Sequence, residues 1–230
     1  MLDAVSLTGI QAGVARMDVV ANTLTNLVTP GFKSARLDQI TLQGGGTAVA
    51  GRTLDFSQGP VELDGGAFAL AIQGDGFFQV DTPLGPRFTR DGGFRVDGSG
   101  TLVTADGLPV SPAVHVPPDA QSILVTRGGQ VLVLFGDGTF QQVGQVGLSS
   151  FANPGGLAQE EGNLFAPTPA SGPPRPGSVA EILSGALEGS NSDLAGEGID
   201  AFFARVAVLA NLEAQRVQDE TVGELIDVLG

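Results

Sequence analysis

The fold is decided at the N-terminus, where residues 7–33 read LTGIQAGVARMDVVANTLTNLVTPGFK. Apolar residues recur here at alternating spacings of three and four, the heptad seam of a helix that packs against another helix. The seam consists of Leu7, Ile10, Val14, Met17, Ala21, Leu24 and Val28. Pro30 and Gly31 end the pattern, because neither residue continues a helix well. A helix of this length is marginal alone, so the seam predicts a helical partner.

The C-terminus carries a second seam of the same kind. Ile199, Phe202, Val206 and Leu209 repeat the spacing, and Asn191, Ser192 or Asp193 can cap the helix that contains them. The pattern weakens at Glu213, and its less regular later members are Val217, Thr221, Leu225 and Val228. The sequence permits the two ends to pair within one chain and also to bundle with neighbouring copies.

Between the two ends the pattern is that of strands. From Val61 to Phe151 the apolar runs are short, and Asp-Gly pairs, the strongest local hairpin signal, follow several of them. We therefore predict a mixed fold, in which an all-β domain rich in Asp-Gly hairpins is inserted between N- and C-terminal α-helices that form a coiled-coil-like assembly domain. The expected boundaries are 1–35 for the N-terminal helix, 36–60 for an extended linker, 61–184 for the β domain and 185–230 for the C-terminal helix.

Composition excludes several classes of function. The 230 residues include 25 acidic and 11 basic side chains, for a formal charge of −14, with no cysteine and one histidine. Disulfides, zinc fingers and iron–sulfur clusters are excluded by the missing thiols, and nucleic acid is disfavoured by the negative charge. No apolar run is long enough to span a bilayer. We expect no catalytic residue, cofactor, metal ligand or nucleic-acid partner, and no enzyme activity.

Three features could carry chemistry, and each has a simpler reading. His115 lies at an apolar strand end, where a structural role is favoured over that of a catalytic base. Glu160 and Glu161 are adjacent carboxylates, which sequence spacing cannot place across a cleft. Asp97-Gly98-Ser99-Gly100 lacks the calcium-loop spacing and reads as a turn.

Three stretches in order along the chain resemble the flagellar basal-body rod and hook proteins. The first runs from Gly9 to Lys33, the second from Ala71 to Asp97, and the third from Glu188 to Leu194. The residues that carry the family motifs are Asn22, Asn26, Gly31, Phe32, Lys33, Gly74, Gly76, Phe77, Phe78, Ser190 and Asn191. The chain departs from the family pattern at Thr23, at Thr25 and at residues 206–208.

The resemblance implies a structural protein of the flagellar basal body. Members of the family are exported by the flagellar apparatus without a cleaved signal peptide and assemble helically in the periplasm. Their terminal helices line the export channel, and their rod transmits torque. The implied partners are further copies, other rod and hook subunits, and the export apparatus. The short stretch between Phe32 and Pro60 favours the proximal rod type within the family.

Two alternatives stay open at this point. The chain could be a distal rod or hook subunit of the same family. It could also belong to another class, that of a secreted β-domain binding module that its terminal helices dimerise.

Overall fold

The computed structural model describes residues 2–43 and 45–229, and it describes side chains for residues 5–43 and 45–222. The chain divides into two compact units. Unit 1 comprises Met1–Leu27, Ser34–Asp55 and Ser192–Gly230, and unit 2 comprises Val28–Lys33 and Phe56–Asn191. The chain therefore passes between the units four times, and segments far apart in sequence build unit 1.

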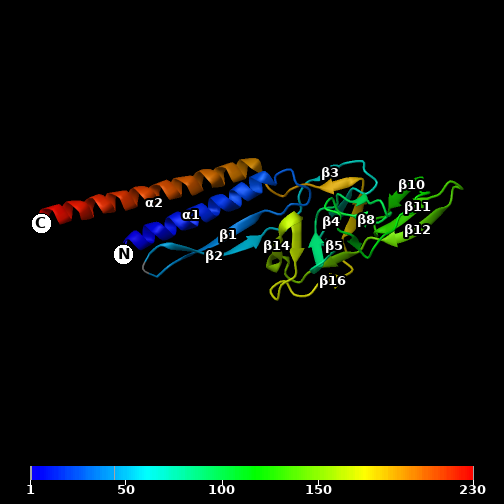
Figure 1. Cartoon of the computed structure of the whole chain (residues 1–230), viewed down its shortest axis with the longest axis horizontal. Helices are drawn as coiled ribbons and strands as arrows, with labels where there is room; N and C mark the ends of the chain where they lie inside the picture. The colour runs from blue at the N-terminus through cyan, green and yellow to red at the C-terminus, as the bar shows by residue number, and fades with distance from the viewer. Residues whose placement is uncertain (1, 44, 230) are drawn as a thin grey trace. The chain divides into compact units, whose positions relative to one another are not determined.

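Unit 1 consists of two helices and one hairpin. Helix α1 spans Leu2–Thr25 and helix α2 spans Leu194–Leu229, and the two run side by side in Figure 1. Asp193 caps α2, because its carboxylate accepts hydrogen bonds from the backbone N–H groups of Ala195 and Gly196. Neither helix, within the described residues, combines the length and the apolar character that a bilayer crossing requires.

The stretch for which we predicted an extended linker forms an antiparallel hairpin. Its strands are β1 (Ala35–Thr41) and β2 (Thr47–Leu54), and the register shifts between Asp38 and Gln39. The chain reverses at Gly45 and Gly46, both at positive φ, which glycine adopts without steric cost. The hairpin contacts α1, where the backbone N–H of Thr47 donates to the hydroxyl of Thr8.

Unit 2 is built from short antiparallel strands. They are β3 (Val61–Leu63), β4 (Leu70–Gln73), β5 (Phe77–Thr82), β6 (Gly85–Thr89), β7 (Arg95–Val96), β8 (Leu102–Val103), β9 (Val110–Ser111), β10 (Ser122–Val125), β11 (Gln130–Leu134), β12 (Phe140–Gln145), β13 (Leu148–Ser150), β14 (Ala158–Glu160), β15 (Leu164–Ala166), β16 (Arg175–Pro176), β17 (Glu181–Ser184) and β18 (Ala186–Glu188). Two short 3₁₀ helices, Pro154–Gly156 and Glu161–Asn163, flank β14.

The largest sheet of unit 2 has the order β14-β15-β6-β5-β13-β16, with β9 also paired to β5. Strands β10, β11 and β12 form a separate three-stranded sheet, which Figure 1 shows as long hairpins in green. The remaining strands form the pairs β3–β18, β4–β17 and β7–β8. Tight turns join many neighbours, and at Asp97 and Asp137 the carboxylate accepts the backbone N–H two residues on.

Strand β5 carries apolar side chains to both of its faces. Phe78 belongs to the main core cluster and meets Phe94 edge to face, with ring centroids 5.0 Å apart. Phe77 packs on the other face against Phe56, Phe151 and Phe165. Both β5 phenylalanines are buried. Unit 2 therefore has a buried apolar core on both faces of β5.

The predicted fold class is wrong. Strands hold more residues than the two helices do, and a hairpin accompanies the helices in unit 1. The helices also do not contact each other through the predicted heptad seams, whose large side chains are mostly exposed. The helix pair is therefore not a coiled coil of the predicted kind. The physical reason is that small residues form the contact between the two helices.

Candidate assembly surfaces and a buried charge cluster

Helices α1 and α2 approach each other through glycine and alanine. Ala12 and Gly13 of α1 and Ala204 of α2 are buried. A Cβ atom added at Gly13 would lie 2.5 Å from Cγ2 of Val208, so the missing side chain permits the close approach. Gly9 faces Asn211 at a similar distance. Small residues thus occupy the contact, and leucine-sized side chains would hold the helices further apart.

One ion pair supports the helix contact. A guanidinium nitrogen of Arg16 lies 2.5 Å from a carboxylate oxygen of Asp200, with both side chains about half exposed. Exposed pairs contribute little to stability. Nearby, burial raises the pKa of Glu197, and the carboxylates of Asp200 and Asp193 raise it further. The start of α2 therefore gathers acidic groups that repel one another.

The predicted seam residues point away from the helix contact. Leu7, Val14, Met17 and Leu24 are exposed on α1, and on α2 Ile199, Phe202, Val206 and Leu209 are exposed together with Phe203 and Leu212. We refer to these ten side chains as the exposed stripes. Large apolar side chains that stay exposed along a helix favour an interaction site.

The remaining residues of the predicted seams differ in how exposed they are. Ile10 is half-buried and Ala21 is exposed on α1, whereas Val28 is exposed beyond the end of the helix. Val217 and Thr221 are exposed on α2. Leu225 and Val228 lie outside the residues whose side chains the structure describes. The seam pattern therefore identifies which side chains are apolar but not which of them meet the partner helix.

In unit 2 the residues Gly31, Phe32 and Lys33 are all buried. Gly31 has φ +65°, and a Cβ atom there would lie 2.4 Å from the backbone of Arg90 and Asp91, so only glycine fits. Its N–H donates to the carbonyl oxygen of Glu188 at 2.6 Å. The motif is therefore held by its own backbone as well as by its side chains.

Lys33 and Glu188 form an ion pair whose side chains are 0% exposed. The ammonium group of Lys33 donates to Oε1 of Glu188 and to the carbonyl oxygen of Ser57, both at 2.6 Å. The same Oε1 accepts the N–H of Gly59 at 3.0 Å. Two buried charges therefore neutralise each other and make further hydrogen bonds, the condition under which a buried pair is tolerated.

A second cation completes this site. Nε of Arg90 lies 3.7 Å from Oε2 of Glu188, and a terminal nitrogen of Arg90 donates to the carbonyl oxygen of Gly74. Burial lowers the pKa of Arg90, although the carboxylates of Glu188 and Asp75 oppose the shift. We call Lys33, Ser57, Gly59, Arg90 and Glu188 the junction cluster, since all of them but Arg90 lie within a few residues of a point where the chain enters or leaves unit 2.

The remaining motif residues support the same region of unit 2. Gly74 has φ +104° and its N–H donates to Gln58, while Gly76 lies against Ser178. The N–H of Asn191 donates to the carbonyl oxygen of Phe32, and its side-chain amide donates to Ser57. Phe77 and Phe78 fill the core on either side of β5.

Three further motif residues have other surroundings. Ser190 is buried at the end of unit 2, next to Asn191. In unit 1, the side-chain amide of Asn26 donates to the carbonyl oxygen of Asn22, and Asn22 lies 3.5 Å from Arg52 of β2. These two asparagines therefore belong to the end of α1 and not to the junction cluster.

Arg90, Ser57 and Glu188 were not predicted from the sequence as site residues. The sequence does give a signal for some carboxylate partner of Lys33, because Lys33 is the only lysine of the chain and a cation that is buried needs a carboxylate. No pattern in the sequence identifies which of 25 acidic residues supplies it. Ser57 contributes its backbone carbonyl, which sequence reasoning cannot detect.

Asp97 and Glu160, which were considered above as candidates for chemistry, take part in structural hydrogen bonds and ion pairs. Oδ1 of Asp97 accepts hydrogen bonds from Ser99 and Thr101, and the Ser99 bond is the largest cause that lowers the pKa of Asp97. Glu160 pairs with Arg87 at 2.7 Å. Within the described part of the chain, no three acidic or histidine side chains gather as a metal site would require.

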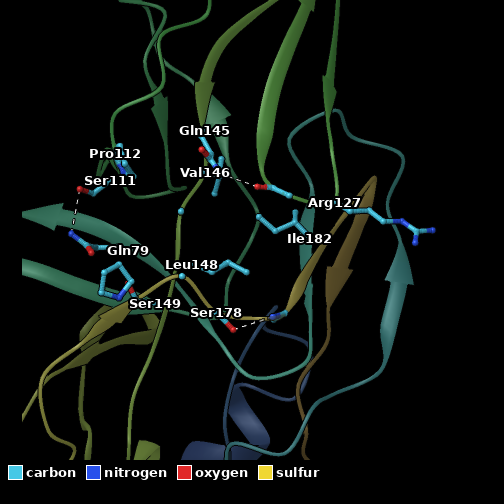
Figure 2. A pocket seen from close by; sticks show the side chains of 15 residues that line it. Gln79, Ser111, Pro112, Arg127, Gln145, Val146, Leu148, Ser149, Ser178 and Ile182 are labelled. Atoms are coloured by element: carbon cyan, nitrogen blue, oxygen red, sulfur yellow. Dashed lines mark hydrogen bonds between the residues drawn. The ribbon is translucent and has the colours of Figure 1, made fainter.

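Figure 2 shows a pocket of about 420 Å³ in unit 2. Val146, Leu148 and Ile182 contribute apolar walls, and Gln79 donates to Ser111 at its edge. Arg127 is the only charged residue among the described residues that line the pocket, and its guanidinium points away from the cavity and lies 3.6 Å from Glu181. The pocket therefore presents no convergent charged groups to a ligand.

Comparisons with known proteins match almost the whole chain. Residues 71–133 match the family described as flagellar hook protein FlgE/F/G D1 domain. The chain is 32% identical over 254 residues to the flagellar basal-body rod protein FlgG of Bacillus subtilis (strain 168), with 96% of each chain covered. Identity to the FlgG of Agrobacterium fabrum is 33% over 248 residues, covering 94% of this chain and 95% of the relative. The flagellar basal-body rod protein FlgF of Caulobacter vibrioides is 34% identical over 191 residues, with 76% of each chain covered.

Proposed function

We infer the function of this chain from one premise: it belongs to the family of flagellar basal-body rod proteins. We propose that it is a structural subunit of the bacterial flagellar rod and that it associates with other rod and hook subunits. In this role the subunit contributes packing surfaces to a shaft that transmits torque and encloses the export channel, and it catalyses no reaction.

The exposed stripes are the observation that carries this proposal. Phe202 of α2 is 62% exposed and Leu7 of α1 is 50% exposed in the single chain. Covering such side chains stabilises an assembly by about 1.5–3 kcal/mol for each one fully buried. Neighbouring subunits that cover the stripes would therefore supply a large part of the association energy.

The exposed stripes lie on α1 and α2, so we expect contacts between subunits to form through these helices. A stripe on one subunit can be covered by a different surface of the next, and contacts of this heterologous kind generate open helical assemblies. We propose that the subunits polymerise in this way in the periplasm, after export by the flagellar apparatus without a cleaved signal peptide. Relatives named FlgG and FlgF are both matched, so the proximal type stays a prediction.

The proposal is tested in a motile bacterium whose own gene for this chain is deleted. Complementation with the natural chain is expected to restore rods in isolated basal bodies and to restore swimming. A double variant, Phe202→Ser with Val206→Ser, is expected to fold but to leave basal bodies without rods. Leu84→Ser is the matched control, since Leu84 is also an exposed large apolar residue, at 83% exposure, but lies at a hairpin turn of unit 2.

Two outcomes would contradict the proposal. Intact rods in the deletion strain would show that this chain is not a rod subunit. Rods that form normally with the double variant would show that the exposed stripes are not assembly surfaces. A binding module dimerised by its helices would instead leave basal bodies unchanged in every strain.

A further inference from the structure

The three-stranded sheet of β10, β11 and β12 carries apolar side chains on both of its faces (Figure 1). One face packs on the core of unit 2, where Val125 and Val131 are buried. On the opposite face the strand register brings six side chains together, because alternate residues of a strand point the same way. We call these six side chains the outer face, and they are Ser122, Leu124, Leu132, Leu134, Phe140 and Gln142.

The outer face is open to solvent. Phe140 is 62% exposed and Leu124 is 50% exposed, and Leu132 and Leu134 on the strand between them are half-buried. An antiparallel sheet that meets water on one side normally alternates apolar and polar residues along its strands. Residues 131–135 do not alternate, since all five are apolar, and such a run is typical of a strand covered on both faces. We therefore expect a partner on the outer face.

The surroundings of the outer face are depleted of charge. Between Arg127 and Glu160 the sequence contains one charged residue, Asp137, and both Arg127 and Asp137 lie in the turns that join the strands. The whole chain, in contrast, has a formal charge of −14. Copies of so acidic a chain repel one another, and they approach most easily through a surface that carries no acid. Depletion of charge and an exposed aromatic ring are also typical of the centre of a protein–protein interface.

The chemistry of the outer face limits what can cover it. A charged partner would lose the hydration of its charges and gain no ion pair, because none of the six side chains is charged. An apolar and uncharged sheet face fits best, since two such faces pack about 10 Å apart with their side chains interdigitated. The outer face of a second copy has this chemistry and meets no unfavourable charge.

We propose that two copies of this chain pair through their outer faces, in a two-fold contact in which each outer face covers the other. A two-fold contact closes after two copies, whereas heterologous contacts continue into open assemblies. The pairing is therefore separate from the contacts through the exposed stripes, and it does not extend a rod. It is a state of free subunits, and it removes the apolar side chains of both outer faces from water.

Sedimentation equilibrium of the full chain over a range of concentrations tests the pairing. The natural chain is compared with the double variant Phe202→Ser with Val206→Ser, which we call the stripe variant, because its association through the exposed stripes is weakened. The stripe variant is expected to form dimers and no larger species. Adding Leu124→Ser and Phe140→Ser should raise the dimer dissociation constant by at least about a hundredfold, since four apolar side chains per dimer are then missing from the contact.

Leu63→Ser with Leu84→Ser, added to the stripe variant, is the matched control. Both side chains belong to unit 2 and are more exposed than Leu124, but they lie outside the outer face. This control should leave the dissociation constant unchanged.

An exchange of charge at Gln142 tests whether the outer face meets itself. Gln142→Glu and Gln142→Lys each place like charges on both sides of the contact, so each variant alone should dimerise about tenfold more weakly. An equimolar mixture of the two should dimerise more strongly than either, because opposite charges then meet. Gln141→Glu is the control, since Gln141 is exposed on the same strand but points to the opposite face.

A stripe variant that stays monomeric at every concentration would overturn the inference, and so would a mixture no stronger than its components. Loss of rods in cells with Leu124→Ser and Phe140→Ser, in a chain that never dimerises, would assign the outer face to another partner and would also overturn it. If dimers form as expected but the deletion strain still builds rods, the proposed function fails while the pairing stands. If the chain stays monomeric and the deletion strain lacks rods, the pairing fails while the proposed function stands.

Discussion

Units 1 and 2 treat their large apolar side chains in opposite ways. Unit 2 buries Phe78 completely and even encloses the charges of Lys33 and Glu188. Unit 1 buries alanine and glycine between its helices and leaves Phe202 exposed. The difference supports our proposal that neighbouring subunits cover the exposed side chains of the unit 1 helices, whereas the core of unit 2 forms within one chain. Three predictions test this comparison.

The first prediction compares two phenylalanines, one from each unit. Phe78→Ala is expected to lower the free energy of unfolding of unit 2 by about 3–5 kcal/mol, because it opens a cavity in a closely packed core. Phe202→Ala in the dilute chain should change stability by less than about 0.5 kcal/mol, since its side chain lies at the surface. Urea unfolding followed by circular dichroism measures both. Equal losses would contradict the proposed division between the two units.

The sequence predicted some parts of unit 1 and missed others for identifiable reasons. The apolar spacing located both helices, and Pro30 with Gly31 lies soon after the end of α1 at Thr25. The pattern did not predict which residues form the contact between α1 and α2. It assigns that contact to large apolar side chains such as Leu7 and Phe202, and not to Gly13. Hydrophobicity alone does not register that a missing side chain permits a closer approach of two backbones.

In unit 2 the sequence could not predict which distant residues form a pair. The family motif drew attention to Lys33, but its partner Glu188 lies 155 residues away. Their pairing depends on how β3, β18 and residues 57–59 come together, and a pattern read along the chain does not contain that information. The hairpin β1–β2 lies in the stretch 36–60 for which we predicted an extended linker, and its turn contains Gly45 and Gly46 at positive φ.

The second prediction compares two glycines of the helices. Gly198 of α2 has open space around it, so Gly198→Ala should raise the stability of unit 1 by up to about 1 kcal/mol through helix propensity. Gly13→Ala brings the same propensity but places a methyl group against Val208 and forces the helices apart. Overpacking typically costs about 1–3 kcal/mol, so a net loss is expected.

Thermal unfolding and amide exchange of α1 measure the two glycine variants. The two variants are expected to change stability in opposite directions. This difference is decisive because both variants make the same chemical change in the same type of element. If Gly13→Ala also stabilises the chain, the close contact of α1 with α2 is not what holds unit 1 together.

The third prediction has the smallest expected effect on stability and concerns Asp91, which follows Arg90 in unit 2. Burial raises the pKa of its carboxyl, and Asp106 adds to the shift, while the N–H of Gly93 that donates to Oδ1 opposes it. The folded chain therefore holds this proton more tightly than the unfolded chain. The contribution of Asp91 to stability is full below the ordinary carboxyl pKa and falls as pH rises through the raised value.

Asp91→Asn keeps an oxygen acceptor for Gly93 but carries no charge. The variant should match the natural chain at acidic pH and exceed its stability at neutral pH by less than about 1 kcal/mol. Asp97→Asn is the control with the opposite sign, because hydrogen bonds from Ser99 and Thr101 lower the pKa of Asp97. Its stabilising contribution is lost as pH falls, so that variant should differ most from the natural chain at neutral pH, in the destabilising direction. Urea unfolding of both variants across the acidic range measures these trends. A difference for Asp91→Asn that does not change with pH would show that its charge is not what unit 2 opposes.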